Sequence, residues 1–218
     1  IFPSAPYPLS KGDDGVKRRF WTAFLAIFCL LVLSSCEKAE SFTPEKAQTL
    51  YRGASCAGTC EIVSCGDYLA EYRVSFRGGA DGWEMEVLAP QSVAGVRAKL
   101  DGGSVTLSWE DAALDALLPQ EPGLSPADLV PHCLELLGEG APDAWGEETV
   151  DGVPCLLLTF TRETGEGEPV SHRLWLERDS LRLRRAEGWQ GETLLLRAAV
   201  TDFSLVPAEE PVAPGENL

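Results

Sequence analysis

The sequence predicts a mainly β protein of the α+β class, in which a long antiparallel sheet carries two or three short helices. Three observations predict this class. Between residues 68 and 109, apolar and polar side chains alternate in four runs separated by glycine-containing turns, and four more runs of β character follow residue 153. Two stretches carry the start and stop signals of short helices. Strict alternation is typical of strands with one buried face and one face in solvent.

The N-terminal 35 residues are predicted to be a targeting signal rather than part of the fold. Lys17, Arg18 and Arg19 precede an apolar run, Trp21–Leu33, which ends at Ser34 and Ser35. This run is shorter than the roughly 20 apolar residues that a membrane-spanning helix needs. A basic start, a short apolar region and small residues are typical of a secretory signal, predicted here as residues 16–35. Because a valine codon can initiate translation in bacteria, residues 1–15 are interpreted as an upstream artefact before Val16; a genuine N-terminal extension is the alternative.

The residue after the small pair is Cys36, and "LSSC" resembles the lipobox of bacterial lipoproteins. The resemblance implies that the thiol of Cys36 carries a diacylglycerol, that cleavage precedes it, and that the new amino terminus is acylated. Several acyl chains are needed for a durable anchor, since one chain alone binds a membrane only marginally. The expected location is therefore the extracytoplasmic face of a bacterial membrane, with residues 36–42 as a tether. A plain signal or an uncleaved anchor is the alternative.

The charge of the remaining chain excludes two kinds of partner. Residues 1–35 contain four of the 18 Lys and Arg and two of the 34 Asp and Glu, so the other 183 residues carry 14 basic and 32 acidic side chains, a net charge of −18. Nucleic acids require clustered basic residues, so no nucleic-acid partner is expected. Anionic lipid head groups are excluded for the same reason, and the membrane attachment should depend on the acyl chains.

The elements follow in chain order within one domain, residues 43–206. Thr43, Pro44 and Gly53 have the residue types of a helix cap, first turn and stop. A second helix is expected from the capping-box pair Ser125 and Asp128 to Gly138, with its regular part delayed or kinked by Pro131. The predicted strands are 68–77, 83–87, 94–100, 105–109, 153–163, 171–180, 183–189 and 191–206, and the proline- and glutamate-rich tail 207–218 is expected to be disordered.

Alternation also predicts which side chains the sheet buries. The buried set is Tyr72, Val74, Phe76, Trp83, Val96 and Leu107, and the exposed set is Arg73, Glu84, Arg97 and Thr106. Because two or three short helices cannot cover so long a sheet, it either closes or leaves an apolar trough. The candidate lining of such a trough for an apolar ligand is Tyr72, Phe76, Trp83, Met85 and Trp109. The alternative is that these aromatic side chains form a closed core.

Five cysteines remain after Cys29 and Cys36 are set aside. Cys56, Cys60 and Cys65 lie close together, but their spacing is wider than that of zinc knuckles and neither histidine is near, so no metal site is expected. One disulfide within this cluster or inert thiols are both compatible with the sequence. Cys133 and Cys155 have the pattern of small core residues.

The sequence contains no recognisable catalytic motif, and no enzyme activity or cofactor is expected beyond the covalent lipid. His132 and Cys133 are adjacent on the second predicted helix, where neighbouring side chains point about 100° apart. They are therefore interpreted as a surface histidine beside a core cysteine. His172 begins a strand and is expected at the surface.

The order of elements from about Thr43 to Val206 resembles the LolA/LolB-like lipoprotein-carrier fold, and most closely its clostridial branch of GerS-like germination lipoproteins. The resemblance rests on "SCAGTCEIVSCGDYLAEYRVSF", "WEMEVLAPQSVAGVRAKLDGGSVTLSWED", "GLSP" and "LWLERDSLRLRRAEGWQGETLLLRAAVTDF". It implies a curved, unclosed antiparallel β-barrel capped by helices. It also implies a surface-anchored lipid-binding or partner-binding module in sporulation or envelope upkeep. An anchored protein cannot ferry lipoproteins, so carrier activity is not transferred.

Two functional hypotheses follow. The first is a membrane-anchored, non-enzymatic lipoprotein that binds a lipid or other apolar ligand in the trough. The second is a protein-interaction module that holds an envelope or spore-cortex partner, such as a cell-wall enzyme, at the membrane. A cavity of about 300 Å³ or more would favour the ligand, whereas a filled interior would favour the partner.

Overall fold

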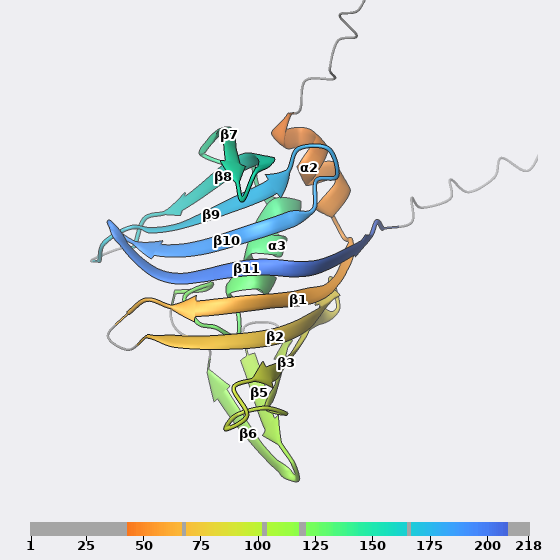
Figure 1. Ribbon diagram of the computed structural model, residues 1–218, viewed down its shortest axis with the longest axis vertical. Coiled ribbons are helices and arrows are strands. Elements are labelled where there is room, and N and C mark those ends of the chain that lie inside the picture. The colour runs from red at the N-terminus through yellow and green to blue at the C-terminus, as the bar shows by residue number, and fades with distance from the viewer. Residues whose placement is uncertain (1–42, 67–68, 102–103, 118–120, 165–166, 209–218) are drawn as a thin grey trace, which may run out of the picture. The chain divides into compact units, whose positions relative to one another are not determined.

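The computed structural model describes residues 43–66, 69–101, 104–117, 121–164 and 167–208 (Figure 1). All of the described residues belong to one compact unit, Phe42–Leu218. The predicted upstream segment, the signal, Cys36 and its tether lie outside these residues, as does most of the predicted tail.

Two helices and eleven strands form in the described part of the chain. The helices are α2 (Pro44–Tyr51) and α3 (Leu129–Glu139). The strands are β1 (Ser55–Ser64), β2 (Ala70–Gly79), β3 (Gly82–Ala89), β4 (Arg97–Asp101), β5 (Ser104–Trp109), β6 (Ala112–Leu117), β7 (Ala144–Val150), β8 (Val153–Arg162), β9 (Val170–Glu177), β10 (Leu183–Gln190) and β11 (Thr193–Val206).

All eleven strands belong to one antiparallel sheet in the order β6-β5-β4-β3-β2-β1-β11-β10-β9-β8-β7. Successive hairpins build each half, and the pairing of β1 with β11 joins the halves. The outermost strands β6 and β7 do not pair with each other, so the sheet is open. The predicted mainly β class, with an unclosed antiparallel sheet and short helices, is thereby confirmed.

Three strands were not predicted. In β1 the inward positions include two cysteines and a glycine, whose small side chains hide the alternation. The segment of β6, "AALDAL", is rich in helix-forming residues, but its pairing with β5 across a two-residue turn imposes the strand conformation. The edge strand β7, "AWGEETV", has a single buried residue, Val150, and so lacks the apolar pattern that identifies a strand.

The second helix begins later than predicted. Residues 125–128 form a turn, and regular α-helix starts at Leu129. Half of the predicted capping box is present, because the Asp128 carboxylate accepts a hydrogen bond from the Ser125 backbone N–H at 2.9 Å, and the Ser125 hydroxyl donates to the same carboxylate at 2.8 Å. Pro131 consequently lies in the first helical turn, where a missing N–H is tolerated.

Helix α3 packs against one face of the sheet, called here the inner face, and contacts β10, β11 and β2 (Figure 1). The main core lies between them. Cys133 and Leu137 of α3 pack there with sheet residues such as Phe76 and Leu174, all of them buried. Full burial of one such large apolar side chain contributes about 1.5–3 kcal/mol, so this layer accounts for much of the stability.

The burial pattern confirms the predicted register of the first meander. Val74, Phe76 and Trp83 are buried, whereas Arg73, Glu84, Arg97 and Thr106 are exposed. A one-residue slip would have inverted every one of these positions.

Three other residues of the predicted buried set, Tyr72, Val96 and Leu107, are half-buried. Val96 lies between a turn and the first residue of β4, and Leu107 lies near the free edge at β6. Among the described residues, no helix is long and apolar enough to span a membrane.

Candidate functional site

A cleft of ≈ 600 Å³ lies between α3 and the part of the sheet formed by β2, β3 and β4. Trp83 and Leu100 line it from the sheet, and they are cross-strand partners in β3 and β4. Pro131 and Leu134 line it from α3, and the end of α2 contributes Tyr51. The cleft exists because α3 is a single helix and the sheet extends past it on this side.

A hydrogen bond crosses the cleft from the sheet to the helix. The indole Nε1–H of Trp83 donates to Oε1 of Glu135 at 2.9 Å. Burial raises the pKa of the Glu135 carboxyl, the indole hydrogen bond opposes that rise, and the carboxylates of Glu139 and Asp128 add to it. The second oxygen of Glu135 has no hydrogen-bond partner among the residues that the structure describes. The site therefore combines an apolar wall with one oriented carboxylate.

Two histidines meet at the loop that precedes α3. The rings of His132 and His172 lie edge to face with their centroids 4.8 Å apart. His172 is 4% exposed, so its predicted surface position is wrong. It occupies an inward position of β9, in register with Phe160 of β8, and the helix covers it.

Both imidazoles are held neutral by their surroundings. Burial, and next to it the proximity of His132, lower the pKa of His172 to about 4, against an opposing effect of the backbone at Gly123 and Pro122. Burial also lowers the pKa of His132. Nε2 of His172 has no hydrogen-bond partner in the described residues. This pair is a buried polar contact that sequence spacing gave no reason to expect.

The predicted ligand-lining residues do not all line this cleft. Of the five, Trp83 lines the cleft. Phe76 and Met85 are 2% and 4% exposed and fill the core, while Tyr72 packs at the core margin. Trp109 is 52% exposed near the β6 edge, away from the cleft. Three lining residues, Leu100, Leu134 and Glu135, were not predicted. The pairing of Leu100 with Trp83 follows from the strand register, whereas local sequence does not show which side of α3 faces the sheet.

The structure shows Cys56, Cys60, Cys65, Cys133 and Cys155 as free thiols, so the possible disulfide within the first cluster does not form. Cys56 and Cys60 lie in one extended strand, and at about 3.3 Å per residue their Cα atoms are about 13 Å apart, beyond disulfide reach. Burial raises the pKa of Cys60 to about 12, which keeps it protonated and unreactive. Within the described ranges, no group of three or more His, Cys, Asp or Glu is arranged to hold a metal ion.

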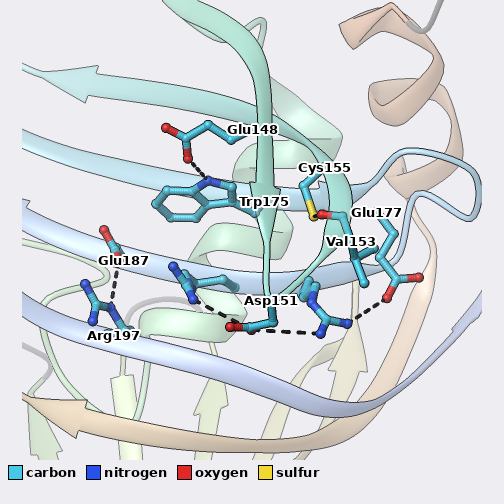
Figure 2. A network of polar contacts seen from close by, with 10 residues as sticks. Glu148, Asp151, Val153, Cys155, Trp175, Glu177, Glu187 and Arg197 are labelled. Atoms are coloured by element: carbon cyan, nitrogen blue, oxygen red, sulfur yellow. Dashed lines mark hydrogen bonds and ion pairs between the residues drawn. The ribbon is translucent and has the colours of Figure 1, made fainter.

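The opposite, outer face of the sheet carries a polar network over β7–β11 (Figure 2). The Trp175 indole donates to Glu148 at 2.6 Å, and Arg185 lies over its ring at 5.6 Å. Glu187, only 3% exposed, accepts hydrogen bonds from Arg197 at 2.7 Å and from the Trp189 indole at 3.0 Å. Asp151 lies 3.9 Å from Arg184 and 3.8 Å from Arg185, and Arg184 also faces Glu177 at 3.3 Å, as expected of a structural network on the outer side of the sheet.

No family model matches the sequence, and no curated protein is significantly similar to it. Solved structures similar to this chain include three with low sequence identity. An uncharacterized conserved protein from Thermus thermophilus has a TM-score of 0.47 at 12% identity over 76% of this chain and 86% of its own. A LolA superfamily protein from Nitrosomonas europaea has a TM-score of 0.36 at 15% identity over 77% and 92%. The structure of the CwlD amidase from Clostridioides difficile in complex with the GerS lipoprotein has a TM-score of 0.36 at 15% identity over 82% and 99%.

Proposed function

We propose that this chain is a lipid-anchored, extracytoplasmic protein of the LolA-like lipoprotein class, which holds an apolar or amphiphilic ligand in the cleft between α3 and β3–β4. The observation that carries the proposal is the cleft itself. Its volume of ≈ 600 Å³ lies within the range of about 300–1,000 Å³ that small-molecule sites occupy. An open sheet with one helix on its inner face leaves such a space without disrupting the core.

The lining supports a ligand with a substantial apolar part. Trp83, Leu100 and Leu134 line the cleft but are almost fully buried within the domain. An occupant would therefore contact only the edges of these side chains that face the cleft. The oriented carboxylate of Glu135 would give such a ligand one fixed polar contact. The "LSSC" lipobox supports a location outside the cytoplasm, with the domain close to the membrane from which a lipid-like ligand would come.

Binding of the neutral dye Nile red to purified 43–208 domain tests the proposal. We expect saturable uptake by the wild type and weaker uptake by Ala80→Trp, because Ala80 is an exposed residue at the cleft and a tryptophan there would obstruct it. The matched control is Ala144→Trp, an exposed alanine on the far edge strand β7, which should bind as the wild type does. Absence of uptake by the wild type, or equal uptake by all three proteins, would contradict the proposal.

A second candidate function, partner binding, is favoured by a different observation. The β5–β6 hairpin presents Trp109 and Leu114, which are 52% and 65% exposed, on the inner-face side of a free sheet edge. Exposed apolar side chains beside an unpaired edge are typical of surfaces that bind another polypeptide. If the cleft binds no dye, this hairpin becomes the better candidate for the functional surface.

A further inference from the structure

One long segment of the sequence contains acidic residues but no Lys or Arg, and this segment forms part of the cleft wall. Between Lys99 and Arg162 there are twelve Asp and Glu residues and no Lys or Arg. This stretch contributes β5–β7, α3 and most of β8, and therefore all of the cleft wall that α3 forms. Apart from His132, the charged side chains that α3 contributes to the cleft are all acidic.

The side chains at the cleft follow this segregation. Glu135 and Glu139 project from α3, Asp101 ends β4, and Asp128 precedes the helix. Arg52 is the one Lys or Arg that lines the cleft among the residues described. His132 also lines it but is kept neutral by burial, so the carboxylates outnumber the cations.

The basic residues of the neighbouring strands cannot compensate for these carboxylates. Arg77, Arg97 and Lys99 alternate with the buried residues of their strands and so lie on the outer face. Arg77 and Arg97 are, in addition, paired there with Glu84 and Glu86. The sheet therefore separates the acidic cleft from the cations of β2 and β4.

Resting on the proposed function, we propose that the cleft selects amphiphiles with a cationic head group and disfavours anionic ones such as free fatty acids. The alkyl part of the ligand lies against Trp83, Leu100 and Leu134. The head group lies against Glu135, whose Oε1 is fixed by the Trp83 indole and whose other oxygen is available to a donor. The apolar cleft supplies the binding site, and the carboxylates decide which head groups it accepts.

The physical basis is the reduced screening of charge in a partly enclosed site. Carboxylates that line a cleft with low-dielectric walls interact more strongly with a bound ion than carboxylates in open solvent. A bound carboxylate or phosphate would be repelled by Glu135 and Glu139 together. An ammonium group would be attracted by both, and added salt would weaken the difference.

The test compares decylamine, decanol and decanoate at neutral pH, which share one alkyl chain and differ in head-group charge. Each competes with Nile red for the purified domain at low ionic strength. We expect decylamine to bind at least about tenfold more tightly than decanoate, with decanol between them, and we expect the ratio to shrink in high salt. Glu135→Gln keeps an acceptor for the Trp83 indole and removes the charge, so it should reduce the decylamine-to-decanoate ratio several-fold.

The matched control is Glu61→Gln, which removes the same charge from an exposed position of β1 and should leave the ratio unchanged. Equal binding of the three compounds, tighter binding of decanoate, or an equal loss of selectivity in both variants would overturn the selectivity while leaving the proposed function in place. A domain that binds none of the three compounds and no dye would overturn both.

Discussion

At the scale of single residues, the buried imidazole of His172 makes the stability of the domain depend on pH. Its pKa is about 4 in the folded protein, below the ordinary value of 6.5. Between these values the unfolded chain binds the proton and the folded protein does not. Stability is therefore complete above pH 6.5 and falls as the pH decreases toward 4, by up to about 3 kcal/mol.

Urea denaturation of the wild type and of His172→Leu over this pH range measures the effect. The variant should lose most of the pH dependence between pH 6.5 and 4, although the acidic groups that titrate near pH 4 contribute to both proteins. Parallel curves for the two proteins would show that His172 titrates in the folded state as it does in the unfolded chain.

The hydrogen bond from Trp83 to Glu135 can be tested separately from the volume of the indole. Trp83→Phe retains most of the apolar contact but removes the Nε1–H, so the free energy of unfolding should fall by about 1–2 kcal/mol. Because this hydrogen bond lowers the pKa of Glu135, the variant should show a higher pKa for that carboxyl. Carboxyl-detected NMR titration measures the second effect. Trp109→Phe, at a half-exposed site, is the control and should change neither quantity.

The burial of individual residues was predictable where alternation was unbroken. Val74, Phe76 and Trp83 are buried as their strand positions require. His172 was not predictable, because a polar side chain at a strand terminus gives no indication of which helix will cover it. The position of Glu135 in the cleft could not be predicted either, because its hydrogen-bond partner Trp83 is 52 residues away in the chain.

At the scale of elements, the pairing of β1 with β11 imposes a close backbone approach at Gly58. A Cβ at this position would collide with the carbonyl oxygen of Asp202 and lie 2.8 Å from Cζ of Phe76. Asp202 lies beside the bulge in the register of these two strands. Glycine is therefore required for β1 to lie beside β11 and to cover Phe76 at the same time.

We expect Gly58→Ala to lower the free energy of unfolding by about 1–3 kcal/mol, because strands or core must shift to admit the methyl group. Gly146→Ala is the matched control. A Cβ at Gly146 of β7 would meet nothing within 4 Å, so this change should be neutral or slightly stabilising. Thermal and chemical denaturation compare them, and equal effects of the two changes would contradict the assigned pairing.

A helix or strand could be predicted where neighbouring residues alone carry its side-chain pattern and turn signals. The first meander has alternating side chains and short turns, both of which are properties of neighbouring residues. By contrast, β6 and β7 are strands because each pairs with an adjacent strand at the sheet edge, where little burial marks them in the sequence. The late start of α3 follows from Asp128, which accepts hydrogen bonds from Ser125 and Gly123 and so holds the preceding turn.

At the scale of the whole molecule, the anchor prediction concerns Cys36. Because "LSSC" follows a short apolar run, wild-type protein expressed in a bacterium should be processed and should fractionate with membranes. Cys36→Ala should give an uncleaved or soluble product, since no thiol remains to receive the lipid. Fractionation with immunoblotting and intact-mass analysis measure both outcomes. A processed variant that still pellets with membranes would show that Cys36 carries no lipid anchor.

The sequence by itself determined the class of the fold, the register of the first meander, the two helices and the negative charge of the chain. These properties follow from consecutive residues, because side-chain periodicity and turn chemistry act over a few positions. The tertiary structure alone decided that β1 and β11 join the two halves, that His172 meets His132, and that the cleft lies beside α3 with Trp83 and Glu135 across it. Those contacts bring together segments that are distant in the chain, and they form because the single helix α3 buries the inner face of the sheet only in part.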